Sequence, residues 1–368
     1  MRYVVARRLG RRGEGLGNEM LPWGKGAIAS EVLNASLIGP AWGINKRRYY
    51  RNFRTTRLDF LLADALVHLP HYSFTEHDYA NEGETDFGTA IEKWASRKDL
   101  FSKRHFTVTV DGMYGGYACI YNARPFLWAK LLNSRDAVSN VYKIASTLDR
   151  RKLFIAVHMR FGGDFVKLED GKSARGRFNV FIPKDWYLNV CQALVDEFGD
   201  SIQFHFFTDR GGAEFAEAVQ RFNPQQLRQP GLTECSDLVL MAQADLRVCS
   251  ISSYSLAASF LSGGPYLWYE PQLTQINGLY SLWGMEEQQR LKGSATDRNA
   301  AIAREIEPGS EWEAEFRGYA MDTRGALPAG LLTQLRRRLL AKNPVASILE
   351  YGSLPSWICE GSLREMKH

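Results

Sequence analysis

The stretch KLFIAVHMRFGGD, residues 152–164, decides which fold the sequence predicts. Its first six residues form a short β-rich run that is apolar throughout after Lys152. Such a run fits a strand buried on both faces of a parallel sheet better than a half-exposed strand. Polar residues and glycines follow at once, including His158, Arg160 and Gly162. The stretch therefore predicts a buried parallel strand with a polar loop at its carboxyl end.

The segments after this strand alternate between helical and strand patterns. This rhythm implies right-handed crossovers and a parallel sheet with helices on both faces. Ligands bind such sheets beyond the carboxyl ends of the strands, so we expect the loops after Val157, Phe207 and Ser250 at one crevice. The expected helices cover residues 183–200, 212–222, 235–244 and 254–261, and the expected strands cover 202–207, 246–250 and 265–269.

The N-terminal region begins a second unit of the same kind. Tyr3–Ala6 predicts a strand, which leads into the glycine-rich turn Gly13–Asn18 and a helix through Ala35. We expect residues 72–111 to be polar, irregular and rich in loops. Residues 327–340 predict an amphipathic helix. The sequence thus predicts an α/β protein with two parallel-sheet units.

Length and composition agree with two soluble units. The chain has 368 residues, of which 45% are hydrophobic and 24% charged, and single cores stop growing at about 250–300 residues. The formal net charge of +5 fits an anionic ligand without requiring nucleic acid, and no nucleic-acid-binding module is recognisable. The basic stretch 46–57 is expected to be a solvated face, with an anionic acceptor or lipid surface as the alternative.

The cysteines and the N-terminus bear on the compartment. The five cysteines are scattered and lack metal-ligand spacing, which is typical of reduced thiols in the cytoplasm. The N-terminus resembles neither a signal peptide nor an anchor, and no run of about 18 apolar residues occurs. We expect a cytoplasmic protein with at most peripheral contact to the inner face of a membrane.

Residues 158–164 suit a phosphate ligand. An arginine stays charged and makes bidentate bonds to phosphate oxygens, and glycines let the backbone approach a ligand closely. Arg160 followed by Gly162 and Gly163 combines both properties. The alternative is an ordinary strand–helix turn in which Arg160 pairs with Asp164. Local composition does not decide between these hypotheses.

Three further loops carry related chemistry. Backbone N–H groups of the loop 13–18 could hold an anion ahead of a helix, although a tight turn is the simpler explanation of the glycines. The loop 208–212 offers small polar residues that could contact a ribose or base. In the loop 250–255, Ser252 or Ser253 is a natural helix N-cap, and the same hydroxyls could face phosphate.

Taken in order, the four loops resemble the fucosyltransferases that share the GT-B architecture, which include bacterial α1,2- and α1,6-fucosyltransferases and protein O-fucosyltransferases. Gly15-Leu16-Gly17-Asn18-Glu19 is similar to their G-x-[LF]-G-N-Q motif, with Glu replacing Gln. Residues 158–164 are similar to H-x-R-x-G-x-D, and Phe161 stands where many relatives have a second arginine. The remaining motifs match at Thr208, Asp209, Asp237, Met241, Ala244, Val248, Ser252, Ser253, Tyr254 and Ser255.

The resemblance implies a GT-B-like protein with two Rossmann-like domains whose parallel sheets face a donor crevice. Residues 1–148 would form the acceptor-side α/β domain, 149–285 the nucleotide-sugar-binding domain, and 286–368 a helical segment that packs back on both. It also implies inverting transfer, without a metal or separate cofactor, from GDP-fucose or a related GDP-sugar to an oligosaccharide or glycolipid hydroxyl. A different nucleotide sugar, or a non-catalytic carbohydrate-binding protein of the same fold, is the alternative.

The resemblance also assigns roles to residues. Arg160 would neutralise the leaving β-phosphate, and Asp237 would lie near the base or ribose. The other expected donor contacts are Gly15, Gly17, Asn18, His158, Gly162, Thr208, Asp209, Ser252, Ser253 and Tyr254. A carboxylate should deprotonate the acceptor hydroxyl; Asp164 is the first candidate, ahead of Glu169, Asp170 and His158. The sequence contains no D-x-D triplet, the pattern that would suggest a metal site.

Overall fold

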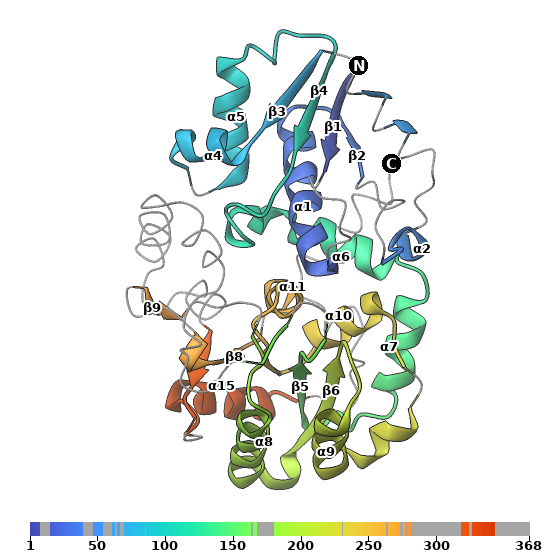
Figure 1. Ribbon diagram of the computed structural model, residues 1–368, viewed down its shortest axis with the longest axis vertical. Coiled ribbons are helices and arrows are strands. Elements are labelled where there is room, and N and C mark those ends of the chain that lie inside the picture. The colour runs from blue at the N-terminus through green and yellow to red at the C-terminus, as the bar shows by residue number, and fades with distance from the viewer. Residues whose placement is uncertain are drawn as a thin grey trace. The chain divides into compact units, whose positions relative to one another are not determined.

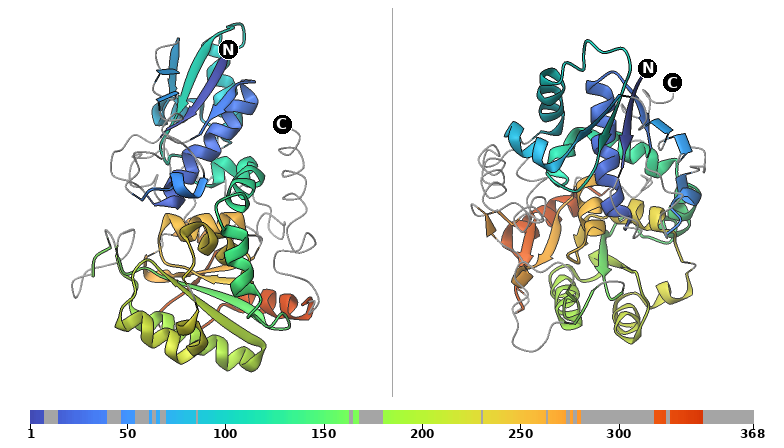
Figure 2. Two further views of the ribbon diagram at one scale, coloured as in Figure 1. Left: turned by 90° about the vertical axis from the view of Figure 1, so that its right-hand side faces the viewer. Right: turned by 45° about the horizontal axis from the view of Figure 1, so that its top comes forward.

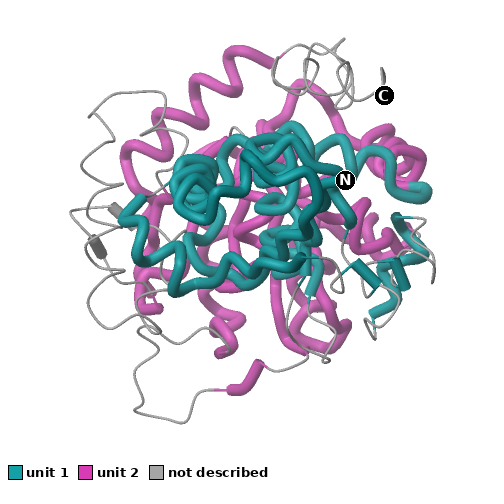
Figure 3. Tube along the Cα trace, turned by 90° about the horizontal axis from the view of Figure 1, so that it is seen from above, with its two compact units in different colours: residues 1–136, 283–305, 357–368 teal, residues 137–282, 306–356 magenta. Residues whose placement is uncertain are grey.

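The structure is a computed structural model in which two compact units can be described (Figures 1 and 3). Described residues up to Asp136 belong to the first unit, and those from Ala137 onward belong to the second. The structure describes residues 1–7, 15–39, 47–53, 61–62, 65–66, 70–84, 86–162, 165–167, 180–229, 231–262, 264–272, 275–276, 279–280, 318–323 and 326–342.

The first unit contains a four-stranded sheet in the order β2-β1-β4-β3, and all three strand pairs are parallel. The helix α1 follows β1 and packs on it. The strands are β1 (Arg2–Ala6), β2 (Ser36–Ile38), β3 (His71–Phe74) and β4 (Phe106–Val110), and the helices are α1 (Leu16–Val32), α2 (Tyr50–Phe53), α4 (Glu76–Glu82), α5 (Phe87–Arg97), η2 (Ala118–Ala123) and α6 (Arg124–Leu132).

Small residues bring α1 close to its neighbours. A Cβ atom on Gly26 would lie 2.8 Å from the Cβ of Ala6 in β1. A Cβ on Gly24 would lie 2.7 Å from the Cδ1 of Ile120 in η2. Both distances are shorter than van der Waals contact, so larger side chains would push the helix away from the sheet.

The second unit contains a five-stranded parallel sheet in the order β11-β8-β7-β5-β6. Figure 2 shows α8 and α9 on one face of this sheet and α7, α10 and α11 on the other. The strands are β5 (Leu153–Met159), β6 (Ile202–Thr208), β7 (Leu246–Val248), β8 (Tyr266–Tyr269) and β11 (Tyr319–Met321), and the helices are α7 (Ala137–Ala145), α8 (Lys184–Phe198), η3 (Gly199–Ser201), α9 (Ala213–Phe222), η4 (Pro224–Arg228), α10 (Glu234–Ala242), α11 (Ser253–Leu261), η5 (Glu270–Gln272) and α15 (Ala329–Leu340); the short strands β9 (Gln275–Ile276) and β10 (Leu279–Tyr280) pair with each other.

The strand β5 is buried along its whole length, as its apolar sequence predicts. Leu153, Ile155 and Val157 pack with α8, α9 and α15 in one large core. Side chains of a strand alternate between faces, so Phe154 and His158 point to the opposite face. The continuous apolar run therefore reflects burial on both faces of the sheet.

The free edge of β6 is covered by side-chain amides. Gln226 accepts a hydrogen bond from the backbone N–H of Phe206 at 2.9 Å and donates to its carbonyl oxygen at 2.5 Å. Asn223 donates to the carbonyl oxygen of Phe204 at 2.7 Å. These amides occupy the backbone groups that a further strand would need, which protects the edge from pairing with another chain.

Strand order identifies a switch point in each sheet. In the second unit the chain runs from β5 to β6 on one side, then crosses to β7 on the other side. The carboxyl ends of β5 and β7 are thus neighbours whose following loops diverge, which is where open α/β sheets bind ligands. In the first unit the corresponding neighbours are β1 and β4.

The structure confirms the predicted fold class, an α/β protein with two Rossmann-like, parallel-sheet units. The expectation of an irregular segment at 72–111 is wrong, because this segment contains β3, α4, α5 and β4. Its two helices begin at side-chain caps, Thr75 and Asp86, which are good local signals. The predicted helix at 327–340 is confirmed as α15, and the strand β11 before it was not expected.

Two further observations concern the described residues. None of their helices is long and apolar enough to cross a membrane. Cys119, Cys191, Cys235 and Cys249 are buried and free of disulfides, and Cys359 lies outside the described part of the chain.

Candidate functional site

The loops after β5 and β6 are joined by an ion pair. Nε of Arg160 lies 3.3 Å from Oδ2 of Asp209, and the two side chains are 13% and 20% exposed. The guanidinium also lies over the ring of Phe165, 4.9 Å from its centroid. A carboxylate on one side and an aromatic face on the other restrict this arginine, so its position is set before any ligand arrives.

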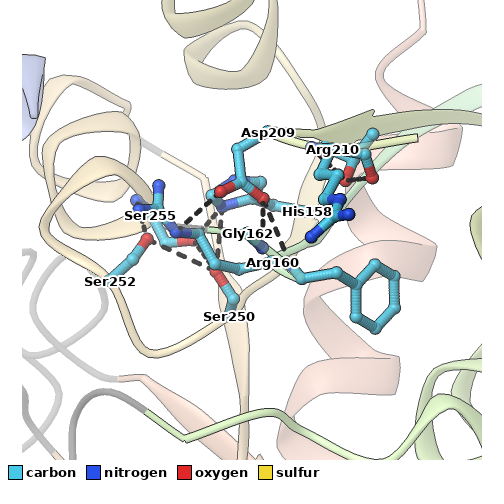
Figure 4. A network of polar contacts seen from close by, with 10 residues as sticks. His158, Arg160, Gly162, Asp209, Arg210, Ser250, Ser252 and Ser255 are labelled. Carbon is cyan, nitrogen blue, oxygen red and sulfur yellow. Dashed lines mark hydrogen bonds and ion pairs between the residues drawn. The ribbon is translucent and has the colours of Figure 1, made fainter. Parts of the chain in front are cut away.

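Asp209 also holds the backbone of the β5 loop. Its Oδ1 accepts hydrogen bonds from the N–H groups of Phe161 at 3.1 Å and Gly162 at 3.2 Å. A Cβ on Gly162 would lie 2.7 Å from Oδ2 of Asp209. The loop therefore requires glycine at this position (Figure 4). Asp209 acts here as an organiser of the loop, with both oxygens engaged.

His158, the next-to-last residue of β5, reaches across to the loop after β7. Its Nδ1 lies 2.7 Å from Oγ of Ser255 and 3.0 Å from Oγ of Ser250. The hydroxyl of Ser250 donates to Oγ of Ser252 at 3.3 Å. Figure 4 shows these side chains side by side. The network bridges β5 and β7, which are the strands at the switch point.

Burial, with a smaller effect of nearby charge, explains the protonation state of His158. The ring is 3% exposed. Its pKa is lowered to about 3, mainly by burial. The positive charge of Arg160 also lowers this pKa, and the negative charge of Asp209 raises it by a smaller amount. His158 is therefore neutral at pH 7 and carries one N–H donor and one acceptor nitrogen. A neutral ring in this position is suited to orienting a ligand rather than supplying positive charge.

The helix α11 begins at the same edge. Ser252 is its N-cap, and its hydroxyl accepts from the N–H of Ser255 at 3.2 Å, so one of the two predicted caps is confirmed. Ser253 is the first helical residue. The ring of Tyr254 lies 5.4 Å from that of His158, and its hydroxyl donates to the carbonyl oxygen of Glu234. The N-terminus of this nine-residue helix adds positive potential at the edge that carries Arg160.

Asp237 lies in the first turn of α10, whose first residue contacts Tyr254. Burial raises its pKa to about 7, and the neighbouring Glu234 adds to this rise. Thr208 bonds within its own turn: its hydroxyl donates to the carbonyl oxygen of Arg210 at 2.9 Å and accepts from that residue's N–H. Thr208 thus shapes the loop that presents Asp209.

The expected site residues divide between the two units. The second unit brings together His158, Arg160, Gly162, Thr208, Asp209, Ser252, Ser253 and Tyr254, with Asp237 on the adjoining helix α10. In the first unit, Gly15 is the N-cap of α1, Asn18 N–H donates to its carbonyl oxygen at 2.9 Å, and the carbonyl oxygen of Gly17 accepts from Tyr117. Gly163, Asp164, Glu169 and Asp170 lie outside the described residues, so the assignment of Asp164 as the base stays a prediction.

The sequence did not single out two charged residues at the first sheet. Lys25 is fully buried in α1, donates to the carbonyl oxygen of Gly112 at 3.2 Å, and lies 3.1 Å from the ring centroid of Tyr114. Asp111 follows β4, and burial raises its pKa while Lys25 lowers it. A lysine inside an apolar helical run was the available signal, because a buried charge requires partners.

No metal ligand set was found in the described residues, where no three His, Cys, Asp or Glu side chains gather at coordinating distance. The groups of this edge that could hold a ligand are charges and N–H groups of the protein itself. Four features meet at one switch point of the sheet. They are the guanidinium of Arg160 held by a carboxylate, the glycine Gly162 packed closely against that carboxylate, the neutral His158 and the N-terminus of α11. This combination defines the class: an α/β protein whose second Rossmann-like unit carries a candidate anion site at the carboxyl edge of its sheet.

Comparisons with known proteins give similarities of limited extent. No family model matches the sequence, and no curated protein matches it. Among solved structures, POFUT1 in complex with GDP-fucose aligns at 14% identity and a TM-score of 0.41, covering 72% of this chain and 97% of that one. POFUT1 in its apo form aligns at 11% identity and a TM-score of 0.37, and a GDP complex aligns at 13% and 0.38, each with the same coverage.

Proposed function

We propose that this protein is a glycosyltransferase that takes a sugar from a nucleoside diphosphate. The observation that carries the proposal is the contact of Arg160 and Asp209 beside the N-terminus of α11, at the switch point of the second sheet. A guanidinium has five N–H donors, so one edge can meet Asp209 while other donors meet a phosphate oxygen. Helix N–H groups favour the same anion.

The reaction explains why such an edge would be needed. Negative charge builds on the diphosphate when the bond between the sugar C1 and the phosphate oxygen breaks. Without a metal, that charge must be taken up by a cation and by oriented N–H groups. Arg160 would supply the cation, and α11 with its cap Ser252 would supply N–H groups. His158 would orient a phosphate or sugar oxygen through a neutral hydrogen bond.

The finer proposal concerns donor and stereochemistry. The order of the four motifs supports GDP-fucose as the donor and inverting transfer to a hydroxyl of an oligosaccharide or glycolipid. A carboxylate would take the acceptor proton, and Asp164 is the first candidate for this base. Asp237 would contact the base or ribose, and Gly15, Gly17 and Asn18 of the first unit would approach the donor. The proposed compartment is the cytoplasm, with peripheral membrane contact at most.

A nucleotide panel tests the proposal directly. Thermal unfolding of the full chain is measured with GDP, UDP, CMP and ADP, each with and without EDTA. Ligand at about 100 times its dissociation constant stabilises the folded state by about 2.7 kcal/mol, which shifts the melting temperature measurably. GDP alone should stabilise the protein, and EDTA should not reduce the effect. Stabilisation by UDP or CMP would indicate another donor, and no response would favour a non-catalytic carbohydrate-binding protein.

A further inference from the structure

The carboxyl edge of the first sheet presents charged side chains from three neighbouring strands. The last residues of β1, β4 and β3 lie side by side in the register of the sheet (Figure 1): Ala6, Val110 and Phe74. Arg7 directly follows β1, Asp111 directly follows β4, and Glu76 begins α4 just after β3. The backbone N–H of Arg7 donates to the carbonyl oxygen of Val110 at 2.9 Å, so the chain ends of β1 and β4 remain together beyond the sheet. These charges therefore gather at the switch point of the first unit, the place where open α/β sheets bind ligands.

A buried cation fixes the loop that carries Asp111. Lys25 of α1 is fully buried, and its Nζ donates to the carbonyl oxygens of Gly112 at 3.2 Å and Asp111 at 3.5 Å. Gly112 has a φ of +72°, which residues with a side chain rarely adopt. A buried charge is costly unless it is used in polar contacts, and here those contacts hold one loop. The fold thus sets the position of Asp111 in advance.

The carboxylate of Asp111 is half-buried but not engaged by the protein. It makes no hydrogen bond and no ion pair within the part of the chain that the structure describes. Burial raises its pKa, and the charge of Glu76 raises it as well, whereas Lys25 and Arg7 lower it. Polar groups removed from water usually have hydrogen-bond partners. The oxygens of Asp111 are therefore available to accept hydrogen bonds from a ligand.

Charge narrows the chemistry of that ligand. Among the described residues, neither Glu76 nor Arg7 uses its charged group in a hydrogen bond or ion pair. Two carboxylates repel an anion, and Arg7 together with Lys25 repels a cation, so the edge favours a neutral polar molecule. A carboxylate only accepts hydrogen bonds and a guanidinium only donates them, whereas a hydroxyl does both. Neighbouring hydroxyls of a saccharide match this set of groups.

We propose that Asp111, together with Glu76 and Arg7, binds hydroxyl groups of a saccharide at the carboxyl edge of the first sheet. The carboxylates accept from the hydroxyls, and the guanidinium of Arg7 donates to a sugar oxygen. In the transferase this saccharide is the acceptor, an assignment that rests on the proposed function. Asp111 then holds hydroxyls that do not react, and so contributes to the choice of acceptor.

The test uses variants of the full chain that remove a charge with little change in size. Asp111→Asn and Glu76→Gln alter the edge, and Glu92→Gln, at an exposed position of α5, is the matched control. Saturation-transfer NMR is recorded with the methyl glycosides of D-galactose, N-acetyl-D-glucosamine, D-mannose and L-rhamnose, and with methylamine as a cationic probe. Thermal unfolding with and without GDP is measured for the same four proteins.

At least one glycoside should bind the native protein and the Glu92→Gln control. Its affinity should fall tenfold or more in Asp111→Asn and by a smaller factor in Glu76→Gln, because hydrogen bonds to a charged acceptor are the stronger ones. GDP should stabilise all four proteins equally, since Asp111 belongs to the first unit and the nucleotide loops around Arg160 to the second.

Three results would overturn the proposal even if GDP stabilises the protein. They are no glycoside binding to the native protein, unchanged binding in folded Asp111→Asn, and tighter binding of methylamine than of any glycoside. Glycoside binding that depends on Asp111 without any response to GDP would uphold the saccharide site. That result would instead contradict the proposed transferase, so the two failures are distinguishable.

Discussion

Nε of Arg160 lies 3.3 Å from Oδ2 of Asp209, so the arginine after β5 is held by the carboxylate after β6. The same carboxylate accepts the backbone N–H groups of Phe161 and Gly162. A single side chain thus fixes both the cation and the loop that bears it. A charge positioned in advance need not reorganise during reaction, which is how electrostatic stabilisation becomes effective.

Replacing Arg160 with alanine should abolish GDP binding or transfer while leaving the fold intact. The side chain follows the end of β5 and is not part of the hydrophobic core. Loss of a group that stabilises developing charge costs about 10²–10³-fold in rate. Steady-state transfer from GDP-fucose, or GDP titration, measures the effect, and circular dichroism checks the fold.

Arg210→Ala is the matched control for Arg160→Ala. Arg210 is exposed on the neighbouring loop, and its backbone, not its guanidinium, bonds Thr208. This variant should keep GDP binding within about twofold of the native value, because an exposed charge is screened by solvent. Full activity in Arg160→Ala, or equal losses in both variants, would contradict the role given to Arg160.

Gly162→Ala should weaken nucleotide binding although it adds a single methyl group. The new Cβ would lie 2.7 Å from Oδ2 of Asp209, so the carboxylate must move and release Arg160 or the loop backbone. The comparison variant is Gly211→Ala, where a Cβ meets no atom within 4 Å. GDP affinity should fall in the first variant and stay near native in the second. Equal affinities would show that the close approach does not matter for binding.

His158 should make stability depend on acid pH. Its pKa is about 3 in the folded protein and roughly 6.5 in an unfolded chain. The unfolded chain therefore binds the proton first as the pH falls, and the stabilisation present above pH 6.5 is lost progressively toward pH 3. The slope contributed by one such group is about 1.4 kcal/mol per pH unit. Urea unfolding of native protein and His158→Gln between pH 7 and pH 4 should show a shallower dependence in the variant; parallel curves would refute the assignment.

Asp237 should have the opposite dependence on pH. Burial raises its folded pKa to about 7, above the roughly 3.9 of an unfolded chain. The stabilisation that the protonated Asp237 contributes is therefore present in full below pH 4. It is lost as the pH rises from 4 through 7. Asp237→Asn should gain stability relative to the native protein at pH 8 compared with pH 4, measured by urea unfolding. A difference that is independent of pH would exclude an ionising Asp237. GDP titration of the same variant tests the proposed contact with base or ribose.

Arg247→Met should destabilise the second unit without changing the contact between Arg160 and Asp209. Arg247 is fully buried in β7 and donates to the carbonyl oxygens of Ala244, Gly264 and Pro265 and to the hydroxyl of Ser262. Methionine would fill much of the space but leave these acceptors unpaired, at a cost of about 3 kcal/mol or more. The free energy of unfolding measures the loss. Unchanged stability would mean that the loops satisfy these acceptors without Arg247.

The sequence by itself determined the strands β5 to β8 and the helices α8 to α11 of the second unit. Continuous apolar runs such as Lys152–Val157 predicted buried strands, because a strand covered on both faces has no place for alternating polar residues. It also determined the polar loops at the strand ends and an N-cap of α11 at Ser252 or Ser253, of which the structure has Ser252. The segment 72–111 was missed although Thr75 and Asp86 are recognisable caps, since its polar exposed faces masked the helical pattern.

Only the tertiary structure decided which of these loops meet. Strand order places β7 beside β5, and this brings Ser250 and Ser255 to His158 across more than ninety residues of sequence. Arg160 pairs with Asp209 of a neighbouring strand, whereas the sequence offered Asp164 as the nearby partner. The neutral state of His158 likewise follows from burial by distant segments. Helices, strands and caps can be recognised in short stretches of sequence because they depend on local backbone geometry. The pairing of strands and the burial of side chains depend on long-range packing, which no short stretch of sequence contains.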